Sequence, residues 1–357
     1  MAKIIHCADF HLDSKFHGSG HKEAVECRQL QRETIKQIVD IANSDGYDLV
    51  LIAGDLFDNA KIYPETLEFL TKIFTSCNCP ICIAPGNHDF YSTSSPYATY
   101  DFGRNVFIFK ENRVSSFDFP EINTTIWGAA FTASNSPCLM NNFPKLEKNR
   151  INIGLFHGDF DNKNSEYSPI SKENIANSKL QYVALGHIHK ATRPLSVGGT
   201  TLAYSGCTMG RGFDECGAKG MLLGEVTQTS CSMNFAPLSG IIYDILHILV
   251  DNDLFSAIEN CLNSDYSNHM LRLILEGQCP ALDVPRLEAV FGKQVRGLTI
   301  LDHTRRPSDI WNEAGENNLR GLFLQELKNN LADYPELTTM AAKFGLAVME
   351  GREVDEL

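Results

Sequence analysis

Short apolar runs that end in metal-binding side chains constrain the fold of this 357-residue chain more than any other feature. The runs cover residues 4–5, 49–53, 81–84, 151–156 and 182–185. Rich in β-branched and aliphatic residues and bounded by glycine, they predict buried strands. The polar residues that follow them are Asp9, His11, Asp55, Asn87, His88, His157, His187 and His189. Because open α/β sheets place their sites at the carboxyl ends of strands, we expect these residues to form one site.

The types of these side chains indicate metal chemistry. Imidazole mixed with carboxylate suits zinc, iron or manganese, and more than four ligands exceeds the need of one tetrahedral zinc ion. Two metals that share a bridging carboxylate are therefore the economical interpretation. Such a pair clamps the attacking and leaving oxygens of a phosphoryl displacement and activates water, so no serine or cysteine nucleophile is needed. A lone Asp-x-His or His-x-His is usually structural, and only the repeated pattern carries the prediction.

In this order, the clusters resemble the calcineurin-like metallophosphoesterase superfamily. The flanking segments 5–14, 54–58, 86–91, 95–97 and 204–215 are similar to SbcD-like DNA-repair exonuclease subunits, and most similar to their YhaO-like branch. The similarity covers about the first two thirds of the chain.

The resemblance implies a role for each residue that matches the family motifs. The first metal would be bound by Asp9, His11, Asp55 and His189, and the second by Asp55, Asn87, His157 and His187. His88 would act as general acid or as donor to the leaving oxygen, with Asp89 orienting it. Two divalent ions are implied, with manganese expected first and iron or zinc as alternatives.

Further residues bear on which nucleic acid the protein would cleave and how it would bind it. Where some nuclease relatives carry a second histidine that assists duplex cleavage, this chain has Asp58, which argues against efficient double-strand exonuclease activity. Arg211 lies in a glycine-rich loop and is a candidate phosphate contact, because a guanidinium matches phosphate oxygens. Tyr91, with Tyr97 and Tyr100, is a candidate for stacking on bases. Packing of these tyrosines in a surface loop is the structural alternative.

The predicted fold class is α/β: a two-sheet metallophosphoesterase sandwich flanked by helices over residues 1–238. Helices are expected at 23–43 and from Pro64, and strands at 106–109, 113–117 and 125–129 are expected to build the second sheet as a meander. Residues 239–306 predict a small α+β cap domain, with basic residues Lys293, Arg296, Arg305 and Arg306 at its edge. Residues 307–357 predict a C-terminal helical segment.

Composition bears on the localisation of the protein and on what it can bind. We find no signal peptide and no run of 18 uncharged apolar residues, so we expect a cytoplasmic protein without membrane contact. The eleven cysteines are scattered and are expected to be reduced thiols. A net charge of −13 argues against unaided binding of DNA, because phosphate neutralisation needs Lys and Arg. No Walker loop is present, so any ATP dependence requires another protein.

The C-terminal segment carries a predicted apolar stripe formed by Leu319, Leu322, Phe323, Leu327 and Leu331. Such a stripe packs either on the chain's own cap or on a partner. The resemblance implies a partner, because the SbcD-like family uses C-terminal helices to bind the coiled coil of an SbcC-like ATPase. DNA is the other expected partner, and a homodimer is compatible with the sequence.

These observations predict a metal-dependent DNA nuclease that hydrolyses phosphodiesters as a subunit of a DNA-repair complex. A phosphomonoesterase or phosphoprotein phosphatase with the same ligand set is the alternative within the superfamily. A non-catalytic scaffold is the alternative outside it, and the filled ligand positions argue against that.

Overall fold

A computed structural model describes residues 1–16, 21–59, 61–146, 149–250, 253–279, 282–305, 310–349 and 351. The chain divides into two compact units. The first comprises Met1–Leu246, Ser264–Leu273 and Glu288–Thr299, and the second comprises His247–Asn263, Ile274–Leu287 and Ile300–Leu357. The domain boundary predicted after residue 238 stays a prediction, and the one after residue 306, like Arg306 itself, lies outside the described residues. Within the described ranges, no helix has both the length and the apolarity needed to cross a membrane.

The first unit contains two six-stranded sheets. The first sheet has the order β12-β11-β1-β2-β3-β4, in which β1 to β4 are parallel and β11 pairs antiparallel with both β1 and β12. Its strands are β1 (Ala2–Cys7), β2 (Leu49–Ile52), β3 (Ile81–Ile83), β4 (Val106–Ile108), β11 (Gly220–Val226) and β12 (Cys231–Pro237).

The second sheet has the order β5-β6-β7-β8-β10-β9, with a parallel centre from β6 to β10 and antiparallel strands at both edges. Its strands are β5 (Ser115–Phe119), β6 (Thr124–Gly128), β7 (Ile151–His157), β8 (Tyr182–Gly186), β9 (Leu195–Val197) and β10 (Thr200–Tyr204).

Side chains point alternately to the two faces of each strand, and this explains why the two sheets stack. In β2, Leu49 and Leu51 point into the core between the sheets, where Ile153 and Leu155 of β7 meet them. Residues of the opposite parity, such as Val50, face the helices. Because both faces of the parallel strands are buried, the runs are apolar at nearly every position.

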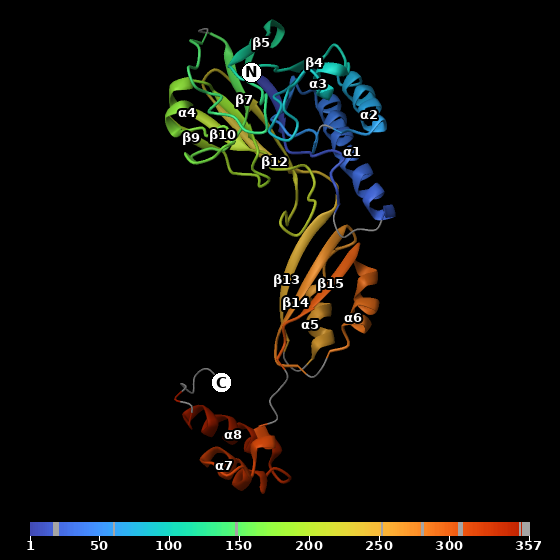
Figure 1. Cartoon of the computed structure of the whole chain (residues 1–357), viewed down its shortest axis with the longest axis vertical. Helices are drawn as coiled ribbons and strands as arrows, with labels where there is room; N and C mark the ends of the chain where they lie inside the picture. The colour runs from blue at the N-terminus through green and yellow to red at the C-terminus, as the bar shows by residue number, and fades with distance from the viewer. Residues whose placement is uncertain are drawn as a thin grey trace. The chain divides into compact units, whose positions relative to one another are not determined.

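Helices cover the outer faces of the sandwich (Figure 1). Helices α1 (His21–Ser44) and α2 (Pro64–Thr75) lie side by side on the first sheet, through residues such as Ile38 and Phe74. The second sheet is covered by α4 (Lys172–Ser178), whose Ile175 packs among the residues of its outer face. A short helix, α3 (Pro96–Thr99), and a 3₁₀ turn at Pro120–Ile122 lie in the connections.

Most elements of the sandwich follow the sequence predictions, and one assignment is wrong. The five apolar runs are β1, β2, β3, β7 and β8, and both expected helices form. However, the segment 106–109 does not join a meander in the second sheet, because β4 pairs in parallel with β3 in the first. Periodicity identifies a strand but carries no information about its partner.

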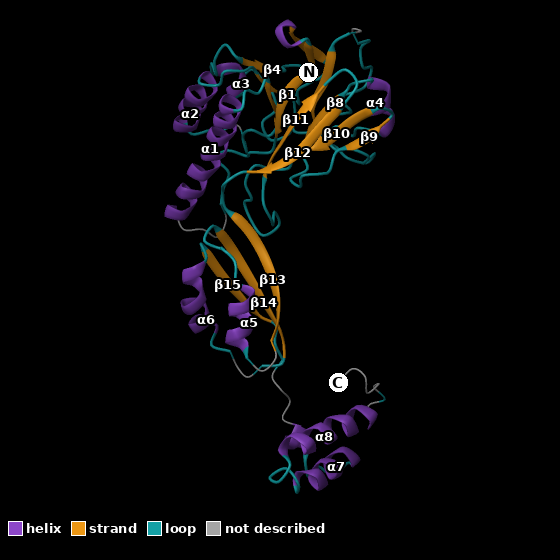
Figure 2. Cartoon of the chain, turned by 180° about the vertical axis from the view of Figure 1, so that it is seen from behind, coloured by secondary structure: helices purple, strands orange, loops and turns teal. Residues whose placement is uncertain are grey.

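Both helices and strands occur in residues 239–306, which were predicted to be α+β. Strands β13 (Ile242–Val250), β14 (His269–Gly277) and β15 (Gly297–Asp302) form a third sheet in that order, and the chain adds α5 (Leu254–Cys261) and α6 (Val284–Phe291) (Figure 2). 3₁₀ turns occur at Gly292–Gln294 and Ile310–Glu313.

Helices α7 (Leu319–Lys328) and α8 (Pro335–Met349) pack against each other, with Leu324, Ala342 and Leu346 at their core. Here the predicted stripe needs correction. Leu331 lies beyond the end of α7, and Leu319 and Leu322 are exposed. Pro335 begins α8, because proline is tolerated in the first turn, where its missing N–H has no helical partner.

Candidate metal centre

The predicted ligands come together at one edge of the sandwich. Strand β1 is followed by Asp9 and His11, β2 by Asp55 and β3 by Asn87, while His157 ends β7 and β8 leads into His187 and His189. Hydrogen bonds tie the loops from the two sheets together: the His187 N–H donates to the Asp9 carboxylate at 3.0 Å. The site therefore depends on both sheets.

The backbone at this edge is strained. Asp9, His11, Asp55 and His187 have φ angles of 53°, 48°, 49° and 104°, in the left-handed region that non-glycine residues rarely adopt. Such conformations persist only when the surrounding structure imposes them, and they cluster at functional sites. Here the Asp9 N–H donates to the Gly54 carbonyl at 3.1 Å, and the His11 N–H donates to the Asp55 carbonyl at 3.0 Å.

Two glycines allow the loops to approach each other. A Cβ on Gly54, whose φ is +93°, would lie 2.3 Å from Nδ1 of His157. One on Gly86 would lie 2.2 Å from an Asp55 carboxylate oxygen. The Gly-Asp and Gly-Asn-His patterns in the sequence thus reflect a steric requirement as well as ligand chemistry.

Two imidazoles face each other at the first half of the site. Nε2 of His11 and Nε2 of His189 are 3.1 Å apart. Nδ1 of His11 lies 3.2 Å from the Asp58 carboxylate, and Nδ1 of His189 lies 2.6 Å from Glu215. A carboxylate beside Nδ1 fixes the proton there, which leaves both Nε2 lone pairs directed at the same space. Two lone pairs at this distance repel unless a proton or a metal cation lies between them.

The second half of the site repeats this arrangement. Nδ1 of His157 donates to the Ala53 carbonyl at 2.9 Å, so its Nε2 carries a lone pair. The amide oxygen of Asn87, Oδ1, is an acceptor. It lies 2.8 Å from Nε2 of His157 and 3.2 Å from Nδ1 of His187. These acceptors again converge on a position that suits a cation.

Asp55 lies between the two halves. Its Oδ2 is 3.7 Å from Nε2 of His11 and 3.4 Å from Nε2 of His157, while its Oδ1 accepts from the His88 N–H at 3.0 Å. Burial alone would raise the pKa of Asp55, but the neighbouring His157 and His11 hold it below its usual value. This is the position that a bridging carboxylate must occupy.

The remaining carboxylate is Asp9. Burial raises the pKa of Asp9 above its usual value, although neighbouring imidazoles oppose that shift. Metal-competent atoms of Asp9, His11 and His189 lie within 4.8 Å of one another, as do those of Asp9, Asp55 and His157. The donor set, the facing lone pairs and the buried carboxylates fit a pair of divalent cations.

His88 lies next to the ligands and is open to solvent, with 45% of its side chain exposed. Its Nδ1 lies 3.1 Å from the Asp58 carbonyl and 3.9 Å from the Asp58 carboxylate. Its ring packs edge-on against His11, with 4.7 Å between ring centroids. Exposure next to buried ligands is the placement that a proton donor to a substrate requires.

The orienting role predicted for Asp89 needs correction. Asp89 is buried, its Oδ1 accepts from the Gly86 N–H at 2.7 Å, and its Oδ2 accepts from the Phe57 N–H and the Tyr97 hydroxyl at 3.1 and 2.5 Å. Burial, together with the charge of Asp55, raises the pKa of Asp89 to about 6. The carboxylate thus stabilises the loop that carries Asn87, and Asp58 is the acidic residue beside His88.

The base-stacking role predicted for the tyrosines also needs correction in part. Tyr97 is 4% exposed, so its ring cannot stack on a base. Tyr91 packs against the core on both sides of the first sheet, and its N–H donates to the Phe131 carbonyl at 2.8 Å. The structural alternative, packing of the loop, accounts for Tyr97, and the stacking role of Tyr91 stays a prediction.

Arg211 makes contacts that the sequence did not predict. Its guanidinium lies 2.8 Å from Glu215 and 3.3 Å from Asp58, the two carboxylates that orient the facing histidines. Glu215 is buried, and although burial alone would raise its pKa, hydrogen bonds from His189 and Arg211 hold it well below the usual value. The phosphate contact predicted for Arg211 remains a prediction.

Glu215 is the functional residue that sequence reasoning missed. It lies 26 residues beyond His189, so no ligand spacing connects the two. The only signal in the sequence is the position of Glu215 at the acidic end of the glycine-rich segment 204–215, which resembles the family but implies no role for this residue.

Comparisons with known proteins agree with this geometry. Residues 2–191 match the family model described as calcineurin-like phosphoesterase. The chain is 28% identical to the uncharacterized metallophosphoesterase YhaO of Bacillus subtilis (strain 168), over 93% of this chain and 89% of that protein. It is 24% identical to the SbcD component of the SbcCD nuclease of Staphylococcus epidermidis, over 60% of this chain and 63% of that protein.

A shorter similarity reaches the DNA double-strand break repair protein Mre11 of Aeropyrum pernix, at 34% identity over 25% of this chain and 21% of that protein. The family match spans more than half of the chain and includes every residue that converges on the site except Arg211 and Glu215. The chain belongs to the calcineurin-like phosphoesterase family.

Proposed function

We propose that this protein is a metal-dependent DNA nuclease that hydrolyses phosphodiesters as the catalytic subunit of a DNA-repair complex. The observation that carries the proposal is the pair of facing donor sets joined by Asp55, which fits two divalent cations. When bound, such a pair neutralises phosphate charge and activates water for in-line displacement. Manganese is the proposed metal, because imidazole, carboxylate and amide donors suit it, with iron or zinc as alternatives.

The chain's own residues have distinct tasks in this proposal. The seven ligands hold the cations, and Asp58 and Glu215 fix the tautomers of His11 and His189. His88 donates a proton to the leaving oxygen. Its exposed ring can reach a bound phosphate, and the Asp58 carbonyl beside Nδ1 supports the protonated imidazole.

Similarity to the SbcD component of the SbcCD nuclease and to Mre11 supports DNA as the substrate. We also propose that the protein is cytoplasmic. All eleven cysteines are unpaired, which agrees with a reducing compartment. Asp58 stands where some nuclease relatives have a histidine, and its carboxylate is engaged by His11 and Arg211. We therefore propose single-stranded DNA as a better substrate than duplex.

The C-terminal helices supply the proposed contact with an SbcC-like coiled-coil ATPase. In α8, Leu337, Met340, Phe344 and Val348 follow helical spacing and are 67%, 56%, 38% and 65% exposed. An exposed apolar stripe of this kind on a helix pair suits a helical partner. Contact with a DNA-bound ATPase would also give an acidic nuclease access to its substrate.

One experiment tests the proposed function against its alternatives. Purified protein with manganese is incubated with single-stranded DNA, duplex DNA, a small chromogenic phosphodiester and a phosphopeptide. We expect turnover of DNA and of the diester. Turnover of the phosphopeptide alone would show a phosphoprotein phosphatase, and retention of metal with no turnover would show a scaffold.

A further inference from the structure

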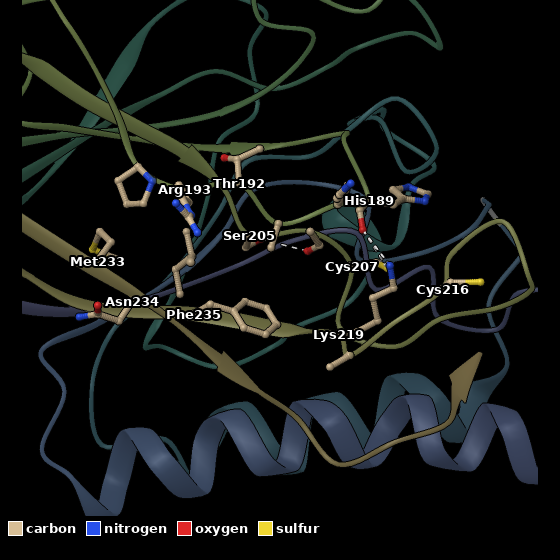
Figure 3. A pocket seen from close by; sticks show the side chains of 16 residues that line it. His189, Thr192, Arg193, Ser205, Cys207, Cys216, Lys219, Met233, Asn234 and Phe235 are labelled. Atoms are coloured by element: carbon tan, nitrogen blue, oxygen red, sulfur yellow. Dashed lines mark hydrogen bonds between the residues drawn. The ribbon is translucent and has the colours of Figure 1, made fainter. Parts of the chain in front are cut away.

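A pocket of about 470 Å³ lies on the first unit beside the metal centre (Figure 3). It opens between the loop that follows β8 and the strands β11 and β12. Figure 3 shows His189 at one end, Met233 and Asn234 at the other, and Phe235 between them. This volume lies within the range of small-ligand sites, roughly 300 to 1,000 Å³.

One residue connects the pocket with the metal centre. The imidazole of His189 points to the ligands, with Nε2 3.1 Å from Nε2 of His11. Its carbonyl oxygen lies on the pocket side, 3.4 Å from Nζ of Lys219 and 3.4 Å from Sγ of Cys207. His189 therefore borders both the pocket and the metal-binding edge.

The charge of the pocket is opposite to that of the protein. The chain has 44 acidic and 31 basic residues, yet the sixteen residues that line the pocket include Lys190, Arg193 and Lys219 and no carboxylate. Lys190 and Arg193 are exposed, and among the described residues neither takes part in an ion pair. A pocket lined by cations and by no carboxylate attracts anionic ligands.

The pocket also exposes an aromatic ring. Phe235 on β12 is 41% exposed, and its neighbours Leu222 and Met233 form a buried apolar floor. A large apolar ring that stays open to water is a candidate binding surface. Aromatic rings next to basic side chains are how proteins hold single-stranded nucleic acids, with bases stacked on the ring and phosphates on the cations.

We propose that this pocket binds one nucleotide of a single strand whose backbone extends to the metal centre, with the base on Phe235 and the backbone phosphate on Arg193 and Lys190. This assignment rests on the proposed function for the identity of the strand. It makes the pocket a positioning subsite: it selects nucleic acid over phosphopeptides and small diesters, which lack a base.

Binding of a fluorescent twelve-nucleotide oligothymidylate with phosphorothioate linkages tests the assignment. The full chain with manganese is used, and anisotropy is measured over a range of salt concentrations. We expect Phe235→Ala to weaken binding by roughly 5- to 100-fold, the loss typical of one stacked base, and Phe235→Tyr to restore most of it. Arg193→Gln should lower the slope of log affinity against log salt by about 0.7, the value for one phosphate contact on a single strand.

Arg104→Gln provides the matched control, because Arg104 is exposed on the same unit and does not line the pocket. Manganese content, by elemental analysis, checks that each variant retains its metal centre. Pocket variants that bind within twofold of the wild type, or that lose no more than Arg104→Gln, overturn the assignment. So does free thymidine monophosphate that binds as tightly as the oligonucleotide, because the site would then serve a mononucleotide.

The same measurements separate the two proposals. Wild-type protein that hydrolyses no DNA but binds the oligonucleotide through Phe235 overturns the proposed nuclease function and supports the pocket. Wild-type protein that hydrolyses DNA while both pocket variants bind normally overturns the pocket assignment alone.

Discussion

The metal centre and the C-terminal helix pair differ in how completely their side chains are buried. At the metal centre, Asp9, Asp55 and His157 are almost fully buried, and strained backbone is held by hydrogen bonds from two sheets. In the helix pair, only a few side chains such as Leu324 are buried, and a row of apolar residues faces solvent. Contacts within the chain thus hold the side chains of the metal centre in place, whereas the helix pair leaves apolar side chains exposed to water.

This difference predicts how each region responds to substitution. A change in the metal centre should act on metal binding and catalysis, because each side chain there has several partners that cannot adjust. A change on the exposed face of the helices should leave the protein intact and weaken only the proposed contact with a partner.

The largest expected effect comes from Asp55→Ala. Its carboxylate lies between both donor sets, so its removal should release both metals and abolish all hydrolysis. Elemental analysis and assay of the chromogenic diester measure the two effects. A variant that keeps two metals per chain would contradict the bridging assignment.

His88→Ala should separate catalysis from metal binding. Its backbone N–H, which holds Asp55, is retained in the variant, so metal content should be unchanged. The rate of DNA hydrolysis should fall by about 10²- to 10⁴-fold, the usual range for a lost general acid. Normal turnover would remove the proposed role of His88 and leave the metal assignments in place.

The resemblance to the superfamily implied the roles proposed for these two residues, and local spacing marked both as site residues. Asp55 and His88 sit in short motifs after apolar strands, so sequence neighbours alone mark them as site residues. Asp58 and Glu215 act through contacts across the fold, 47 residues from His11 and 26 from His189, and nothing local predicts such pairs. The parallel pairing of β4 with β3 escaped prediction for the same reason.

Glu215→Gln tests one of these unpredicted contacts. The neutral amide cannot hold a proton on Nδ1 of His189 as a carboxylate does, so metal affinity should fall by roughly 10- to 100-fold. Titration with manganese measures the change, and Glu173→Gln, on the exposed face of α4, is the matched control. Equal affinity in the two variants would show that the contact does not tune the metal centre.

Leu324→Ala tests the small core of the helix pair. Leu324 is fully buried between α7 and α8, and large-to-small changes at such sites cost about 2 to 5 kcal/mol. Because the helix pair has few other buried residues, hydrogen exchange of its backbone amides should accelerate while exchange in β1 and β7 stays the same. Faster exchange throughout the protein would show that the two regions unfold together.

The smallest expected effect on stability comes from Leu337→Ser, on the exposed face of α8. The side chain is 67% exposed, so the free energy of unfolding should change by no more than about 0.5 kcal/mol, and hydrogen exchange should match the wild type. If the face binds the coiled-coil ATPase, the double variant Leu337→Ser and Met340→Ser should lose co-purification with that partner while hydrolysis of the small diester is retained. Loss of helix protection in Leu337→Ser would instead mean that the face packs on the chain itself. Intact co-purification would contradict the proposal that this face binds the ATPase, and the proposed contrast between the buried metal centre and an exposed, partner-binding helix face would no longer hold.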